Sequence, residues 1–225
     1  MGSCRQPNRP GGNVTGVTIL SNELAPKQLQ VLRELAPNAD PFGVLVDPAV
    51  PNIQSIIADL QAAARTLGLQ LVVVNARTDS DLETAFATFS QQRVGAVLVG
   101  TGTFFNRRME QLAALAGRHF LPAIFPWREY ALAGGLISYG SSLGYGYHQL
   151  GIYTGRILKG DKPADLPVQQ ITKIEMARGS GAPSRGRSRR GHSSRRCQFD
   201  RGLVRASRFT PLPSGERGRS ERLPV

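Results

Sequence analysis

Between residues 41 and 126 the chain alternates short apolar runs with longer segments that are apolar on one side only. The apolar runs have the length of β-strands and cover residues 42–46, 69–74, 94–99 and 122–125. The longer segments repeat their apolar residues at helical spacing and cover residues 53–67, 79–91 and 105–119. Strands that are apolar on both faces belong to a parallel sheet covered by helices on both sides. With right-handed crossovers, the pattern predicts a doubly wound α/β layer.

The segments on either side of this repeat have the same character. Residues 17–20 predict a short strand, and the leucines at 29, 32 and 35 mark one face of a helix that ends before Pro37. After the repeat we expect a strand at residues 136–139, a helix at 143–158 and an edge strand at 167–174. The predicted fold class is therefore α/β, with a doubly wound parallel sheet.

From residue 176 onward the composition changes. Residues 176–225 hold 13 of the chain's 28 Lys and Arg residues, all of them Arg, against three of its 16 acidic residues. The net charge of +12 is therefore mostly a property of this segment. A sequence rich in Arg, Gly, Ser and Pro without a repeating apolar pattern predicts a disordered tail. Such a tail would contact the phosphates of nucleic acids without sequence specificity.

Several classes of protein find no support in the sequence. It has no apolar run of membrane-spanning length, and the first residues lack the apolar stretch of a secretory signal. Cys4 and Cys197 lie outside the patterned region, and no Cys/His group has metal-ligand spacing. Phosphate-binding glycine loops and nucleophile motifs are absent too. We therefore expect no metal, no cofactor and no catalytic residue.

Candidate binding residues follow the predicted strands. In open α/β sheets, ligands bind beyond the carboxyl ends of the strands. The side chains expected at this edge are Asp47, Thr101, Phe104, Trp127, Arg128, Tyr139 and Ser141. The aromatic rings among them suit a stacking wall and Arg128 suits a ligand carboxylate, so the set indicates a small organic ligand.

Each of these candidates also has a structural interpretation. Trp127 is the only tryptophan, and such a residue can equally close the edge of a domain. Arg128 can pair with Glu129 or another nearby acid, and Asp47-Pro48 can cap the next helix. The sequence leaves these alternatives open.

Seven segments resemble one family. Residues 8–18, which read Asn-Arg-Pro-Gly-Gly-Asn-Val-Thr-Gly-Val-Thr, resemble the linker of bacterial ABC-transporter substrate-binding proteins of the type I periplasmic fold. The branch indicated is the one related to the tryptophan-binding TrpX-like proteins. The similarity continues in residues 32–37, 62–69, 127–129, 134–140, 153–160 and 163–169.

The resemblance implies a division of the chain. Residues 1–18 correspond to a first-lobe remnant and crossover, 19–137 to a second α/β lobe, and 138–175 to the hinge with a first-lobe helix and strand. Residues 176–225 are the Arg-rich tail. Compared with the family, the chain reads as truncated at its N-terminus and as frameshifted near Met176. Helix 143–158 would then lack the sheet on which it normally packs, so we expect it to be mobile or to form a dimer.

The resemblance also implies a function. Members are the solute-binding components of ABC-type uptake systems: two lobes close on a ligand such as an amino acid, and the closed form docks on a membrane permease. They perform no chemistry and act in the periplasm. Without a signal this chain would stay in the cytoplasm as written, and with one lobe incomplete it would bind weakly. The alternatives are a nucleic-acid-binding protein acting through its tail and a small α/β enzyme.

Overall fold

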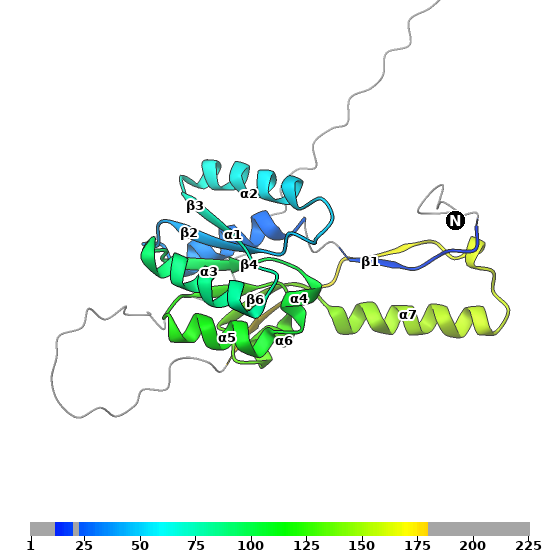
Figure 1. Ribbon diagram of the computed structural model, residues 1–225. Helices are drawn as coiled ribbons and strands as arrows, with labels where there is room; N and C mark the ends of the chain where they lie inside the picture. The colour runs from blue at the N-terminus through cyan, green and yellow to red at the C-terminus, as the bar shows by residue number, and fades with distance from the viewer. Residues whose placement is uncertain (1–11, 20–22, 180–225) are drawn as a thin grey trace, which may run out of the picture. The chain divides into compact units, whose positions relative to one another are not determined.

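The main feature of the computed structural model, which describes residues 12–19 and 23–179, is a six-stranded sheet (Figure 1). Its order is β3-β2-β4-β5-β6-β8. The strands are β2 Phe42–Val46, β3 Leu71–Asn75, β4 Ala96–Val99, β5 Ala123–Phe125, β6 Ile137–Ser141 and β8 Ile174–Arg178. Every neighbouring pair is parallel except β6 and β8, which run antiparallel. The predicted parallel α/β sheet is therefore confirmed.

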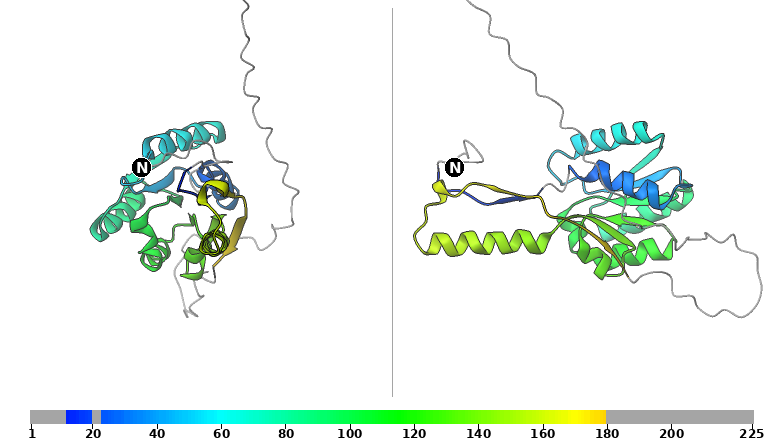
Figure 2. Two further views of the ribbon diagram at one scale, coloured as in Figure 1. Left: turned by 90° about the vertical axis from the view of Figure 1, so that its right-hand side faces the viewer. Right: turned by 180° about the vertical axis from the view of Figure 1, so that it is seen from behind.

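Helices cover both faces of this sheet (Figure 2). On one face lie α1 Ala25–Leu35 and α2 Ile53–Leu67. On the other lie α3 Asp79–Gln91, α4 Thr103–Asn106, α5 Met109–Arg118 and α6 Arg128–Leu132. Alternate residues of β2 supply the two cores: Val44 and Val46 pack with α1 and α2, whereas Leu45 packs with α3 and α5. This two-sided burial explains why the strands read as continuous apolar runs.

The helix ends show why the predicted pattern breaks where it does. Gly68 ends α2 with a φ of 66°, a left-handed conformation that favours glycine, and the next backbone N–H, of Leu69, donates to Ala64 O at 2.9 Å. Thr78 opens α3 with a capping box, in which its side chain accepts from the Asp81 N–H and the Asp81 carboxylate accepts from the Thr78 N–H.

One predicted helix is divided. The segment at 105–119 is split into α4 and α5, with Arg107 and Arg108 between them. The N–H groups of these two arginines donate to Phe104 O and Phe105 O, three residues earlier, which closes the first helix in a tight turn. The Arg108 guanidinium then pairs with Asp79 of α3 at 2.6 and 3.1 Å. The helical spacing of apolar residues in the sequence does not predict this tertiary contact.

The predicted edge strand at 167–174 is also divided. Its first part is β7 Gln169–Ile171, which pairs in parallel with β1 Val17–Ile19. Its last residue begins β8, which continues to Arg178 and completes the large sheet against β6.

The predicted boundaries near the end of the folded region differ from those of the structure. The described residues include 176–179, which were predicted to begin the tail. The large sheet takes in residues on both sides of the predicted division at 138. The rest of the tail, with Cys197, and the first residues, with Cys4, lie outside the described residues.

The helix α7 Leu143–Leu158 runs alongside β1 (Figures 1 and 2). Its bounds are those predicted. Tyr153 is buried, and its hydroxyl donates to Pro167 O at 2.6 Å, so this residue does find a partner. Leu150 and Ile157 remain 40% and 37% exposed. A short 3₁₀ turn, η1 Pro163–Asp165, follows before β7. None of the described helices is long and apolar enough to cross a membrane.

Candidate functional site

The strand order creates a crevice between β2 and β4. The chain passes from β2 to β3 on one side, then crosses to β4 on the other side of β2. The connections therefore leave β2 and β4 in opposite directions, and ligands of open α/β sheets bind at such a switch point. Asp47 directly follows β2, and Thr101 lies two residues beyond the end of β4. The sheet topology thus brings two of the predicted residues to the same place.

A hollow of about 270 Å³ lies at this switch point. Its lining comes from the loop after β2, from the loop after β4 and from α4, and consists of Asp47, Ala49, Val50, Pro51, Thr101, Gly102, Thr103 and Asn106. The volume is close to the lower end of the range of about 300–1,000 Å³ in which small-molecule sites fall. The polar atoms of Asp47, Thr101 and Asn106 give the hollow its chemistry, and Asn106 was not among the predicted residues.

Asp47 shapes the wall of this hollow. The residue is 4% exposed, and its Oδ1 accepts from the Ala49 N–H at 2.9 Å, so one carboxylate oxygen forms the turn that leads toward α2. The predicted alternative, in which Asp47-Pro48 caps the next helix, is not what the structure shows, because the N-cap position of α2 is Asn52. Gly102 packs so closely on the carboxylate that an added Cβ would lie 2.7 Å from Asp47 Oδ2. The loops after β2 and β4 are thus fitted to each other.

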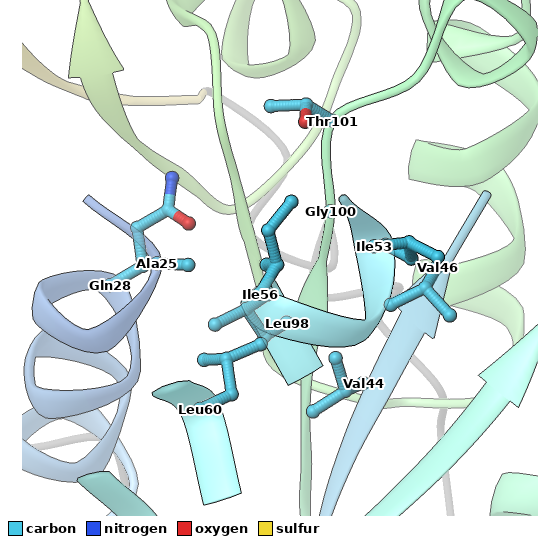
Figure 3. Close-up of a pocket in the computed structure, with 10 residues that line it drawn as sticks. All are labelled: Ala25, Gln28, Val44, Val46, Ile53, Ile56, Leu60, Leu98, Gly100 and Thr101. Atoms are coloured by element: carbon cyan, nitrogen blue, oxygen red, sulfur yellow. The ribbon is translucent and has the colours of Figure 1, made fainter. Parts of the chain in front are cut away.

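A second, much smaller cavity of about 20 Å³ lies on the α1 side of the same strands (Figure 3). It is the size of a water molecule. Thr101 lines both spaces, and Gln28 of α1 lines the smaller one. The Gln28 Nε2 donates to Tyr139 O at 2.7 Å, which ties α1 to β6. Gln28 is 3% exposed and was not predicted, although a glutamine inside the buried stripe that includes Ala25 and Leu32 was a readable signal.

Trp127 lies in the core rather than in the hollow. Its side chain is 5% exposed and packs with Phe125 and Tyr130 in the cluster under α3–α6. Phe104 packs partly against the same cluster, with the Arg108 guanidinium 5.7 Å from its ring centroid. The Trp127 indole Nε1 has no hydrogen-bond partner among the described residues. A buried donor without a partner is costly, so this position is less stable than a fully paired one would be.

Arg128 pairs with an acid, but not with its neighbour Glu129. Its Nη1 lies 3.5 Å from Oε2 of Glu175 on β8, and its side chain is half exposed. The pKa of Glu175 is lowered, chiefly by the Ser142 hydroxyl, with the charges of Arg128 and Lys173 acting in the same direction. Glu175 was not predicted, because nothing in the local sequence indicates that residues 47 positions apart meet.

Tyr139 and Ser141 occupy alternate positions of β6 and therefore point to the same face of the sheet. Tyr139 is partly buried, which raises the pKa of its hydroxyl. The Oγ of Ser141 is buried without a partner among the described residues. Phe104, Trp127, Arg128, Tyr139 and Ser141 do not line the hollow, so only Asp47 and Thr101 of the predicted set share it. The described residues hold no group of three His, Cys, Asp or Glu side chains placed for a metal.

Helices on both faces of a parallel sheet, with polar residues and a hollow at its switch point, define a ligand-binding α/β domain. The chain belongs to the family of ABC transporter substrate binding proteins, whose model matches residues 4–177. The predicted family, which is a family of binding proteins, is thereby confirmed. A search of curated proteins gives no match.

Solved structures show the same fold. A conserved domain protein from Vibrio cholerae matches with a TM-score of 0.67 and 24% identity, over 77% of this chain and 58% of its own length. A Streptococcus pneumoniae ABC domain in complex with L-Trp matches with a TM-score of 0.63 and 22% identity, over 76% and 59%. A ligand-free, open substrate binding protein from Clostridium difficile matches with a TM-score of 0.55 and 21% identity, over 78% and 58%. The chain thus spans about three fifths of the length of each of these structures.

Proposed function

We propose that this chain is a solute-binding component of an ABC-type uptake system that binds a small organic ligand at the carboxyl edge of its six-stranded sheet. The observation that carries the proposal is the hollow at the switch point between β2 and β4, with Asp47 and Thr101 in its wall. Membership of the substrate-binding family supports it. The L-Trp held by the Streptococcus pneumoniae protein makes amino acids the first ligands to try.

Each of the predicted side chains has its own part in binding the ligand. Asp47, Thr101 and Asn106 hydrogen-bond polar groups of a ligand that fills the hollow. Arg128 receives a ligand carboxylate, since guanidinium and carboxylate groups match in shape and charge. The Ser141 hydroxyl binds a ligand oxygen, and Phe104, Trp127 and Tyr139 supply aromatic surface. The side chains outside the hollow reach a ligand that extends from it along the sheet edge.

The partners follow from the family. A ligand is held between two lobes that close by a hinge, and the closed protein docks on a membrane permease outside the cytoplasm. In this chain we assign the lobe to residues 19–137 and the hinge to parts of 138–175, where β6 leads into α7 and β7 leads back into β8. The exposed apolar residues of α7, including Tyr147 and Leu158, would bind the rest of such a protein or a second copy.

Thermal unfolding of the chain with a panel of amino acids and small carboxylates tests the proposal. A ligand at one hundred times its Kd adds about 2.7 kcal/mol to the free energy of unfolding. For a protein of this size that raises Tm by several degrees, at about 2–4 °C per kcal/mol. A panel in which no compound raises Tm contradicts the proposal.

Variants locate the binding site. Arg128→Gln should weaken a carboxylate ligand by about tenfold to a hundredfold, the loss of one charged hydrogen bond. Arg118→Gln is the matched control, because Arg118 is an exposed arginine of α5 that pairs with Glu83 at 2.9 Å, away from the strand ends. Equal affinity in both variants would move the site away from Arg128.

A further inference from the structure

A cluster of charged and polar side chains joins the large sheet to α7. It lies where β6 ends at Ser141 and where β8 begins at Ile174. The Ser142 N–H donates to Lys173 O at 2.9 Å, which holds the two crossing segments together. The Ser142 side chain also accepts from the Tyr145 N–H at 3.3 Å and so caps α7. Any movement between the sheet and α7 passes through this crossing.

Glu175 is the centre of the cluster. Its side chain is 20% exposed, less than those of Arg128 and Lys173, which are 50% and 57% exposed. One carboxylate oxygen lies 3.5 Å from Arg128 Nη1, and the other lies 3.6 Å from Lys173 Nζ. The Ser142 side chain also acts on the carboxylate and lowers its pKa. The carboxylate is therefore held from three sides.

Both cation contacts of Glu175 are loose, at 3.5 Å for Arg128 and 3.6 Å for Lys173, and Arg128 is the one that follows β5 at the carboxyl edge of the sheet. A tight pair between a guanidinium and a carboxylate has a separation of about 2.7–2.9 Å, and here the separation is 3.5 Å. Because the side chain of Arg128 is half exposed, another carboxylate can reach it from solvent. Glu175 would keep Ser142 and Lys173 as partners after losing Arg128. The exchange therefore leaves no buried charge unpaired.

We propose that Glu175 stands in for the ligand's carboxylate, holding Arg128 in the empty protein until an incoming carboxylate replaces it. This rests on the proposed function and deepens it, because it assigns the ligand a carboxylate group and makes Glu175 a specificity-determining residue. A ligand without a negative group cannot take Arg128 from Glu175. The same exchange removes the Arg128–Glu175 contact between α6 and β8, next to the point where β6 leads into α7.

Acetate, the simplest carboxylate, tests this exchange without knowledge of the natural ligand. The NMR signal of the Arg128 Nε–H, assigned by its loss in Arg128→Lys, is followed as acetate is added to the whole chain. We expect Glu175→Gln to lower the acetate concentration at half-saturation at least threefold relative to the unaltered chain. Glu175→Asp, which keeps the charge but shortens the side chain, should shift it in the same direction and also serves if the Gln variant does not fold.

Glu129→Gln is the matched control, because it removes one negative charge beside Arg128 without touching the pair. The titration is done at physiological salt, where exposed charges more than about 8 Å from Arg128 are largely screened, so the comparison concerns only the charges near it. An equal gain of acetate affinity in Glu129→Gln and Glu175→Gln would show a general charge effect and overturn the proposal. So would an Arg128 signal that acetate leaves unmoved in the Glu175 variants. If acetate behaves as expected while the ligand panel fails, the exchange stands and the proposed function falls.

Discussion

At the scale of single residues, the described part of the chain holds four buried polar atoms without hydrogen-bond partners. The buried side-chain atoms without a hydrogen bond among the described residues are Trp127 Nε1, Glu129 Oε2, Ser138 Oγ and Ser141 Oγ. All four belong to the segment from the end of β5 to the end of β6. Buried polar groups are nearly always paired in folded proteins, so this segment is where the described structure has most capacity for further hydrogen bonds.

Gly102 tests the fit of the two loops that form the hollow. Its φ of 175° is open to any residue, so only space restricts the position. In Gly102→Ala the new Cβ would lie 2.7 Å from two atoms of Asp47, and we expect a loss of about 1–3 kcal/mol in the free energy of unfolding. Urea denaturation measures it.

Gly117→Ala is the control for this change. Gly117 lies in α5, and an added Cβ there meets nothing within 4 Å. We expect a gain of about 0.5–1 kcal/mol, because alanine favours a helix more than glycine does. Similar losses in both variants would mean that the Asp47–Gly102 contact is not tight.

The sequence indicates site residues that follow a strand and misses those that arrive from elsewhere. Asp47 and Thr101 are readable because the carboxyl ends of parallel strands meet at one edge. Gln28 reaches the edge from α1, and Glu175 reaches it from β8. Those positions depend on how α1 packs and on the antiparallel pairing of β8, which no local pattern encodes.

At the scale of elements, the short helices around the hollow depend on hydrogen bonds to other elements, because they are too short to be stable by themselves. The four-residue α4 supplies Thr103 and Asn106 to the lining of the hollow, and so short a helix is not stable by itself. The Tyr130 hydroxyl of α6 donates to Asn106 Oδ1 at 3.2 Å. Tyr130 is fully buried, which raises the pKa of its hydroxyl and keeps the group a neutral donor.

A double-mutant cycle measures this tie. Tyr130→Phe removes the hydroxyl alone, and Asn106→Ala removes its acceptor. We expect a coupling of about 0.5–1.5 kcal/mol in the free energy of unfolding, the usual net contribution of one hydrogen bond. Additive effects of the two substitutions would show that α4 is positioned by other contacts.

The capping box of α3 allows a second test at this scale. Thr78→Ala removes the side-chain acceptor of the Asp81 N–H, and we expect a loss of about 1 kcal/mol by thermal or urea unfolding. Thr84→Ala changes the same residue type on the exposed surface of the same helix, where the hydroxyl only donates to Ser80 O. Its effect should be near zero, and an equal effect at both positions would contradict the role of the cap.

Element type is predicted well, and element ends less well. The bounds of α2, α3 and α7 follow from their periodicity and from the glycine and capping residues beside them. The break between α4 and α5 lies at Arg107 and Arg108, and Arg108 pairs there with Asp79 of α3. The strand β8 was missed because it alternates exposed and partly buried residues at a sheet edge, beside a composition that indicates disorder.

At the scale of the whole molecule, the chain combines a complete sheet with a layer that leaves apolar surface exposed. The large sheet has helices on both faces, whereas β1 and β7 form a two-stranded sheet beside α7. Exposed apolar residues gather on this second layer: Val14, Tyr145, Tyr147, Leu150, Ile152, Ile157 and Leu158. The chain spans about three fifths of the length of the solved structures that share its fold.

Acid should destabilise the molecule through its paired carboxylates. The pKa of Glu175 is lowered by Ser142 and the neighbouring cations, and those of Asp79 and Asp81 are lowered by hydrogen bonds. A lowered pKa means that the unfolded chain binds protons more tightly, so the stabilisation is present above the unfolded values of about 4 and lost as pH falls through the folded ones. We expect urea unfolding to show this loss below about pH 4, with a shallower slope in Glu175→Gln. An unchanged slope in that variant would contradict the assignment of Glu175.

The most direct measurement maps the ligand on the structure. A compound that raises Tm is added to isotope-labelled chain, and the backbone amide signals are followed by NMR. The account predicts the largest changes at the carboxyl edge, around Asp47, Thr101 and Trp127, with little change at the opposite edge around Phe120, which precedes β5. Changes centred on the opposite edge or on the outer surface of α7 would contradict a binding site at the switch point.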